Sequence, residues 1–302
     1  MAMFLVTGGC GFIGSHLVDA LLARGDRVRV LDDLSSGRRD NIPETVEVVP
    51  GDVRDAALLA KLMQGVSGCF HLAAIASVAR SNEDWSGTHA INLGGAIAVF
   101  DAAAKAGKLP VVYASSAAVY GDTAEMPLSE TSATRPLSAY GADKLGCELH
   151  ARTAGIVHGV PTFGLRFFNV FGPRQDPKSP YSGVISIFAR QIMEGEPLTV
   201  LGDGEQVRDF IHISDVVGAL MRAMAAATVE APVANVCSGR PVTINQLAQA
   251  LGKVCDRPAL IRHLPARAGD IVISIGDPAR ARALLDLPEA IGLEPGLATL
   301  LG

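Results

Sequence analysis

Short runs of valine, isoleucine and leucine alternate with longer helical patterns along much of this 302-residue chain. Strands that are apolar almost throughout, and that are separated by helices, are typical of a parallel sheet covered on both faces. The sequence therefore predicts an α/β fold with a Rossmann-like, doubly wound parallel sheet. We expect strands at 3–7, 27–32, 46–50, 68–72, 110–115, 161–167 and 233–236, and helices at 12–24, 55–64, 88–106, 138–158 and 214–227.

The pattern changes after Asn169. Residues 170–183 contain three prolines and are predicted to form a loop. We expect a helix at 184–194 and short strands near 198–201 and 207–212, a return to the sheet over 214–236, and a mixed, loop-rich remainder. The chain is thus predicted to form one domain from residues 1–169 plus about 213–237. A smaller, discontinuous C-terminal domain would comprise about 170–212 plus 238–302.

Composition narrows the class of protein. Although 49% of residues are hydrophobic and the mean hydropathy is +0.30, no uninterrupted apolar run reaches the ~18 residues of a membrane helix. The N-terminal residues lack the basic region of a signal peptide and are expected to form the first strand. The net charge is −5 and no lysine or arginine block occurs, so neither nucleic acid nor an anionic membrane is an expected partner.

The cysteines and histidines predict neither disulfides nor a metal site. Five cysteines are scattered without a C-x-x-C pair, which favours free thiols in a reducing, cytoplasmic setting. The seven histidines show no ligand spacing such as H-E-x-x-H.

A glycine-rich segment, Gly8-Gly9-Cys10-Gly11-Phe12-Ile13-Gly14, follows the first predicted strand and opens the first predicted helix. Glycines at G-x-x-G-x-x-G spacing allow a tight turn and a close approach of the backbone to a pyrophosphate. The helix N-terminus then offers N–H groups and a positive dipole to the phosphates. The segment predicts a dinucleotide site.

Asp32-Asp33 ends the second predicted strand, 18 residues beyond Gly14. A carboxylate there can accept hydrogen bonds from ribose hydroxyls and would repel a 2′-phosphate, so NAD is favoured over NADP. The nearby Arg38 and Arg39 count against this preference, because an arginine can accommodate that phosphate. Asp52, after the third strand, has two interpretations: a cofactor contact near the adenine, or the N-cap of helix 55–64.

Tyr140-Gly-Ala-Asp-Lys144 places a phenol and an ammonium one turn apart if residues 138–158 are helical. An ammonium beside a phenol favours the phenolate, and a serine from a neighbouring strand end could hold or pass the proton of a substrate alcohol. Ser115-Ser116-Ala117-Ala118-Val119-Tyr120-Gly121 supplies such serines. Tyr and Lys at this spacing also occur on solvated helices, so the pair indicates a catalytic site only together with the glycine segment.

Taken together, these motifs resemble those of the extended short-chain dehydrogenase/reductase superfamily, and within it the NAD-dependent nucleotide-sugar epimerases, in particular the UDP-glucose (UDP-galactose) 4-epimerases. The resemblance covers nearly the whole chain. Besides the glycine, serine and tyrosine motifs, it rests on His71-Leu72-Ala73-Ala74, Asn92, Leu165-Arg166-Phe167-Phe168-Asn169-Val170-Phe171-Gly172-Pro173, Arg208-Asp209-Phe210-Ile211-His212 and Arg267-Ala268-Gly269-Asp270.

The resemblance implies that the first domain binds NAD and the second a nucleotide sugar, with Ser116, Tyr140 and Lys144 as catalytic residues. The implied cofactor contacts are Gly8, Gly11, Phe12, Ile13, Gly14, Asp32, Asp33, Ser36, Gly37, Asp52, Val53, Leu72, Ala73, Ala74, Ala76, Asn92, Ser115, Tyr140, Lys144 and Phe168. The implied substrate contacts are Ser77, Ser116, Asn169, Gly183, Val184, Arg208, Arg267, Asp270 and Ser274. Two arginines suit a diphosphate; the alternatives are a surface ion pair for Arg208 beside Asp209 and a solvated loop charge for Arg267.

The implied reaction is 4-epimerisation: hydride passes from the sugar C4 to NAD, the resulting 4-keto sugar turns over, and hydride returns to its opposite face. Nucleotide-sugar dehydratases carry an Asp-Glu pair after the catalytic hydroxyl, and decarboxylating relatives tend to carry a glutamate; here Ala117 and Ala118 stand instead. A 4-ketoreductase, a UDP-glucuronate 4-epimerase and an inactive NAD-bound regulatory protein remain alternatives.

The resemblance also bears on substrate size and assembly. Ser274 occupies a position where a bulky tyrosine tends to exclude acetylated sugars, and Ser77 and Gly183 are small as well. UDP-N-acetylglucosamine and UDP-N-acetylgalactosamine are therefore expected substrates beside UDP-glucose and UDP-galactose. Relatives commonly dimerise through the helices predicted at 88–106 and 138–158, so a homodimer is expected.

Overall fold

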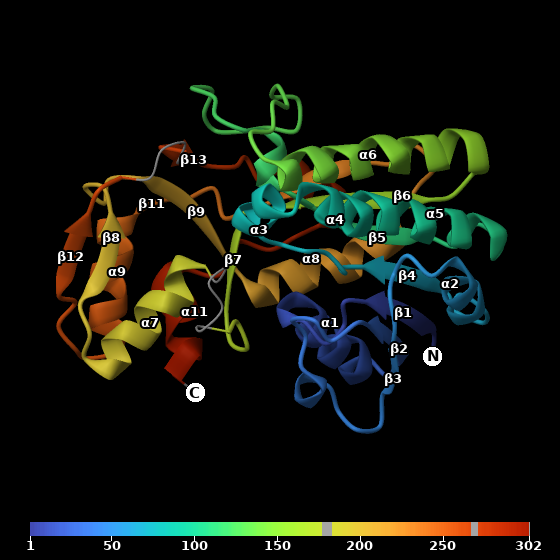
Figure 1. The fold of residues 1–302 in the computed structure, drawn as a ribbon, viewed down its shortest axis with the longest axis horizontal. Coiled ribbons are helices and arrows are strands. Elements are labelled where there is room, and N and C mark those ends of the chain that lie inside the picture. The colour runs from blue at the N-terminus through green and yellow to red at the C-terminus, as the bar shows by residue number, and fades with distance from the viewer. Residues whose placement is uncertain (177–182, 267–270, 302) are drawn as a thin grey trace.

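The computed structural model describes residues 1–176, 183–266 and 271–301 (Figure 1). In this part of the chain, a seven-stranded parallel sheet has the order β10-β6-β5-β4-β1-β2-β3. The order reverses between β1 and β4, as a doubly wound sheet requires, so the predicted fold class is confirmed. The strands are β1 (Met3–Thr7), β2 (Arg27–Asp32), β3 (Glu47–Pro50), β4 (Gly68–His71), β5 (Val111–Ser116), β6 (Thr162–Phe167) and β10 (Val233–Val236).

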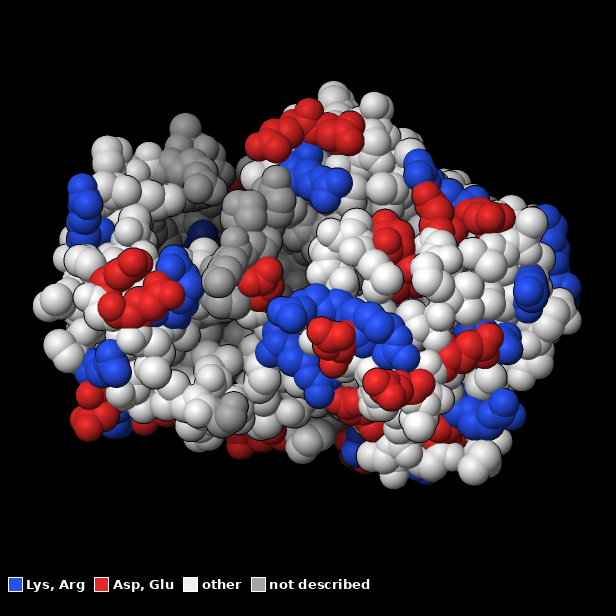
Figure 2. Space-filling view, turned by 60° about the horizontal axis from the view of Figure 1, so that its bottom comes forward, with Lys and Arg blue, Asp and Glu red and all other residues white. Residues whose placement is uncertain are grey.

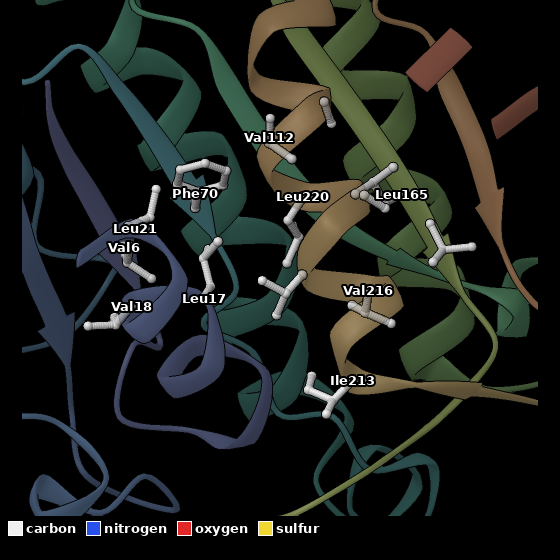
Figure 3. Packing of buried hydrophobic residues seen from close by; sticks show 14 of the residues in the cluster. Val6, Leu17, Val18, Leu21, Phe70, Val112, Leu165, Ile213, Val216 and Leu220 are labelled. Atoms are coloured by element: carbon white, nitrogen blue, oxygen red, sulfur yellow. The ribbon is translucent and has the colours of Figure 1, made fainter. Parts of the chain in front are cut away.

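Helices cover both faces of this sheet. On one face, Leu17 and Leu21 of α1 and Leu220 of α8 pack with Phe70 and Leu165 of the strands (Figure 3). On the other face, α2, α5 and α6 bury a second apolar cluster against the same strands. Helices cover both faces, which is why most residues of the strands are apolar and buried. These helices are α1 (Phe12–Ala23), α2 (Ala56–Leu62), α5 (Gly95–Lys105), α6 (Ala139–His158) and α8 (Ile213–Ala226).

The helix predicted at 88–106 is not one regular helix, and this prediction was wrong in detail. The structure has α4 (Trp85–His89), a π-helical turn η2 (Ala90–Gly94) and then α5, preceded by a short helix α3 (Val78–Glu83). Gly95 follows the wide turn and lies against Val53, where a β-carbon would stand 2.6 Å from the valine Cγ1. The π-helical turn is therefore followed directly by a close contact between Gly95 and Val53.

A second, smaller body of strands and helices lies beside the large sheet in Figure 1. Its core joins Phe171, Phe188, Phe210, Leu247 and Leu297. Residues 170–183, predicted to be loop, begin with part of a short strand, and the tail predicted to be loop-rich contains several ordered elements. The elements of this body are β7 (Asn169–Phe171), α7 (Val184–Glu194), β8 (Leu198–Leu201), β9 (Val207–His212), β11 (Pro241–Thr243), α9 (Ile244–Val254), β12 (Ile261–Leu264), β13 (Ile273–Ser274) and α11 (Leu293–Ala298). The helix α10 (Ala279–Leu285) instead packs against α8 and β10 of the large sheet.

Asp209 joins the two bodies. Its carboxylate accepts hydrogen bonds from Ser238 N (2.8 Å) and Oγ (2.7 Å), from Gly239 N (2.9 Å) and from Gly276 N (3.3 Å). Ser238 follows β10 of the large sheet, whereas Gly276 follows β13. Asp209 is fully buried, so the interpretation of it as part of a surface ion pair with Arg208 is wrong.

Positive and negative side chains are intermixed over the face shown in Figure 2. Within the described residues, no helix combines the length and the apolar character needed to cross a membrane.

Candidate active site

The glycine segment forms a tight cradle between β1 and α1. Gly8 has φ +70°, and a β-carbon there would stand 2.6 Å from Ala73 N, on the strand-end loop next to it. A β-carbon on Gly14 would collide with the carbonyl oxygen of Gly8. The first turn of α1 has no side-chain cap, so its N–H groups remain available to an anion. The cradle fits the pyrophosphate of a dinucleotide.

Asp32 lies at the end of β2 beside this cradle. Its Oδ2 accepts a hydrogen bond from Cys10 N (2.9 Å), its Oδ1 accepts one from Leu34 N (2.9 Å), and a β-carbon on Gly37 would come within 2.9 Å of Oδ1. Burial raises the pKa of the Asp32 carboxyl above its usual value. The remaining lone pairs can accept the ribose hydroxyls predicted to bind here. Asp33 instead binds Ser35 N and Oγ of its own loop.

Asp52 is not the N-cap of the following helix, and that interpretation was wrong. α2 is capped by Asp55, whose side chain accepts from Leu58 N at 3.0 Å. The Asp52 carboxylate pairs with Arg54, and this hydrogen-bonded pairing lowers the pKa of Asp52. A cofactor contact by Asp52 stays a prediction.

Asn92, in the π-helical turn, holds the loop that carries the predicted cofactor residues Leu72, Ala73, Ala74 and Ala76. Asn92 Oδ1 accepts a hydrogen bond from Ile75 N (2.8 Å) and its amide nitrogen donates to Ile75 O (3.2 Å). Asn92 is 1% exposed, so its side chain holds this loop and does not face solvent. Ser77, at the end of the same loop, caps α3 by accepting from Arg80 N.

Tyr140 and Lys144 lie on the first turns of α6, as the spacing predicts. Ser138 caps this helix, and Tyr140 N donates a hydrogen bond to Ser81 Oγ at 3.2 Å. Lys144 Nζ lies 5.8 Å from the centre of the Tyr140 ring and donates a 2.8 Å bond to Ala114 O of β5. The lysine, 4% exposed, is thereby fixed between the tyrosine and the strand that carries Ser116.

Ser116 ends β5 and starts the single turn η3 (Ala117–Val119), whose Ala118 N donates to its Oγ at 3.1 Å. Ser115, the preceding residue, is buried and donates its hydroxyl proton to Glu148 of α6. The two adjacent serines therefore have different roles: Ser116 remains half-buried at the site, and Ser115 holds the helix.

His71, a buried residue near Lys144, had no role predicted from the sequence. Its Nδ1 is 2.8 Å from Thr7 Oγ1, and both residues are buried. Burial, and next the charge of Lys144, lower the pKa of His71 to about 3. The imidazole is therefore neutral at physiological pH and leaves Lys144 as the cation beside Tyr140.

Several predicted substrate residues meet on the smaller sheet. Ser274 of β13 pairs in register with Arg208 of β9, and Asn169 of β7 pairs with Phe210 and donates its amide to Asp209 O (2.9 Å). Gly183 precedes Val184 at the start of α7. Phe168 is buried against Gly276 and Tyr120. The predicted residues Arg267 and Asp270 lie outside the described part of the chain.

Residues 4–237 match the profile of the NAD dependent epimerase/dehydratase family. The chain belongs to this family. Its Rossmann fold, glycine cradle and Tyr140–Lys144 pair agree with that membership, and NAD is the cofactor, as predicted. The resemblance to NAD-dependent nucleotide-sugar epimerases is confirmed, and the chain is an enzyme of the NAD-dependent epimerase family.

Individual relatives show the same likeness. The chain is 37% identical over 303 residues to a UDP-glucose 4-epimerase of Mycolicibacterium smegmatis, covering 97% of this chain and 96% of the relative. It superposes with a TM-score of 0.95 and 34% identity on the UDP-glucose 4-epimerase of Thermotoga maritima bound to UDP-glucose, covering 99% and 97% of the two chains. The same TM-score, with 36% identity and the same coverage, relates it to a UDP-N-acetylglucosamine 4-epimerase of Methanobrevibacter ruminantium in complex with UDP-N-acetylmuramic acid.

Proposed function

We propose that this enzyme interconverts the C4 epimers of UDP-hexoses and retains its NAD between turnovers. The observation that carries the proposal is the segment after Ser116: η3 begins with Ala117 and Ala118, and neither can donate or accept a proton. A dehydratase needs an acid and a base there to remove the C5 proton and expel the 6-hydroxyl. Without them, a 4-keto sugar can only be reduced again.

Tyr140 is the base in this proposal. Its phenol oxygen takes the proton of the sugar 4-hydroxyl and later returns it, with the Lys144 ammonium 5.8 Å from the centre of its ring. Ser116 Oγ hydrogen-bonds the same sugar oxygen and holds it in line. The chemistry that NAD supplies when bound is reversible hydride transfer. The smaller body of the protein, with Asn169 and Arg208, holds the nucleotide while the keto sugar turns over.

The substrate range is proposed to include the 2-acetamido sugars. Ser274 lies beside Arg208 in the small sheet, and its short side chain leaves room that a tyrosine would fill. The two UDP-glucose and UDP-N-acetylglucosamine epimerases of similar structure support both sugar types as candidates.

A homodimer is part of the proposal. Leu149, Ile156 and Val157 form one exposed apolar stripe on α6, with 60%, 69% and 66% of each residue accessible. α4 and α5 pack beside this helix and add Trp85 and Ile97, 71% and 38% accessible. A second copy of the chain would cover this surface.

The direct test is to incubate the purified protein with UDP-galactose, without added cofactor, and to follow UDP-glucose by anion-exchange chromatography. Product should form without net reduction of any nucleotide. If neither UDP-galactose nor UDP-N-acetylgalactosamine is converted, the epimerase proposal is wrong. Tyr140→Phe should abolish conversion while thermal unfolding and NAD binding stay near wild type.

A further inference from the structure

A row of three polar side chains crosses the large sheet one residue before the catalytic edge. Ser115 of β5 pairs in register with Arg166 of β6, and Arg166 pairs with Asn235 of β10. They are 1%, 5% and 0% exposed, in a sheet whose buried residues are mostly apolar. Because residues paired across parallel strands direct their side chains to one face, the row presents its polar groups together.

Two side chains from outside the sheet complete the row. Glu148 of α6 accepts Ser115 Oγ and Arg166 Nε at Oε1 (2.5 and 2.9 Å), and Arg166 Nη2 at Oε2 (2.7 Å). Tyr120 accepts Arg166 Nη1 at 2.9 Å and donates its hydroxyl to Asn235 Oδ1 at 2.6 Å. The resulting chain of hydrogen bonds, Ser115–Glu148–Arg166–Tyr120–Asn235, is called the polar row below.

The polar row holds the catalytic residues from several sides. Ser115 directly precedes Ser116, and Tyr120 directly follows the turn that Ser116 caps. Glu148 lies one helical turn beyond Lys144 and two beyond Tyr140 on α6. Residues on both sides of the Ser116 turn, and one turn beyond Lys144, are therefore linked to Arg166.

Stability alone is a poor reason for this arrangement. Glu148 and Arg166 are each 7% exposed in their side chains, and a buried ion pair loses about as much in desolvation as it gains. Leucine and valine fill equivalent positions elsewhere in the same sheet. What a bidentate pair provides beyond apolar packing is a fixed distance and direction.

We propose that Glu148 and Arg166, with Tyr120, are positioning residues that set the alignment of Ser116 with Tyr140 and Lys144. They do not touch the substrate; they act through the ends of β5 and the first turns of α6. This inference rests on the proposed function, because the aligned trio is the one assigned to proton transfer.

The test compares Tyr120→Phe and Glu148→Gln with Tyr113→Phe in NAD-bound protein. Tyr113 is a matched control: it is a buried tyrosine of β5, two residues before Ser115, whose hydroxyl has no hydrogen-bond partner among the described residues. Tyr120→Phe removes one hydroxyl and almost no volume, so we expect this variant to remain folded even if Glu148→Gln does not. Three measurements are made: steady-state kinetics of epimerisation (kcat and KM), the Kd of NAD, and hydrogen exchange of peptides covering 115–120 and 139–148.

We expect both row variants to lower kcat about tenfold, since small misplacements of catalytic groups are costly, while KM and the Kd of NAD stay within about twofold. Exchange over 115–120 should quicken in the row variants alone. Tyr113→Phe should match wild type in all three measurements. Unchanged kcat in Tyr120→Phe, whether or not exchange quickens, would overturn the proposal, because a purely structural role moves exchange or stability without kcat.

Hydrogen exchange separates this inference from the proposed function. If wild-type protein converts no UDP-sugar, the function is wrong, and quickened exchange at 115–120 in the row variants then supports only the ordering of that segment by the polar row. If exchange is then identical in all three variants, the positioning inference fails as well.

Discussion

Gly141 of α6 lies against the backbone of Ala118, so closely that a β-carbon on it would stand 2.6 Å from the Ala118 carbonyl oxygen. This contact brings the helix that carries Tyr140 to the turn that Ser116 caps. Gly141→Ala should therefore push α6 away from η3. We expect kcat to fall by roughly two orders of magnitude and the free energy of unfolding to fall by about 1–3 kcal/mol, measured by turnover and urea denaturation.

Gly218 on α8 is the matched control, because a β-carbon there would meet nothing within 4 Å. Alanine is the better helix former by about 1 kcal/mol, so Gly218→Ala should stabilise the protein slightly and leave turnover unchanged. Stabilisation by both substitutions would mean that helix propensity, and not the approach to Ala118, decides the role of Gly141.

Asp32 should make NAD binding sensitive to acid. Because burial raises the pKa of this carboxyl above its ordinary value of 3.8, protonation begins at a higher pH than for an exposed aspartate. Ribose hydroxyls donate to the ionised form, so the Kd of NAD should rise as the pH falls toward that raised pKa. Calorimetric titrations of NAD-free protein between pH 7 and about 4.5 measure this.

The raised pKa of Asp32 should also make the stability of the protein depend on pH. A raised folded-state pKa means that the Asp32 contribution to stability is fully present below the unfolded pKa and is lost as pH rises through the folded pKa.

Asp32→Asn should weaken NAD binding at neutral pH and flatten the acid dependence of that binding. Asp40→Asn, an exposed change in the same loop, should do neither. An equally steep acid dependence in Asp32→Asn would assign it to another group.

The large sheet could be predicted from the sequence because its strands are buried on both faces and leave a continuous apolar signal. The strand β12 of the smaller body is largely exposed, so its residues carry no such signal. The helix α9 does carry a local sequence signal of another kind: Thr243 and Gln246 form a capping box that marks its start. This start lies within a stretch of mixed polarity, so the hydrophobic pattern alone does not predict the helix.

The site divides in the same way. Tyr140 and Lys144 were predictable because one helical turn fixes their separation. The pair of Glu148 and Arg166 was not, since it joins a helix to a strand 18 residues later, and only the register of β5 with β6 brings Ser115 to it. Local spacing is readable from sequence, whereas contacts across strands depend on the assembled sheet.

The exposed stripe on α6 should hold two copies of the chain together. Ile156→Arg places a charge in its centre and should convert a dimer into monomers of 31.4 kDa, measured by light scattering after gel filtration. Leu260→Arg is the control, because Leu260 is 59% exposed on the smaller body and lies away from α6. A wild-type protein that is already monomeric would contradict the proposed dimer.

Ser274 should set which sugars enter. It lies on β13 beside Arg208, so a larger side chain there would reduce the space near the bound nucleotide sugar. Ser274→Tyr should lower kcat/KM for UDP-N-acetylglucosamine and UDP-N-acetylgalactosamine at least about tenfold, the scale on which a pocket discriminates small groups, and change it much less for UDP-glucose and UDP-galactose. Ser274→Ala, which removes only a hydroxyl, should leave both pairs active. Equal losses for both pairs in Ser274→Tyr would show that this position supports the site as a whole and does not select the 2-acetamido group.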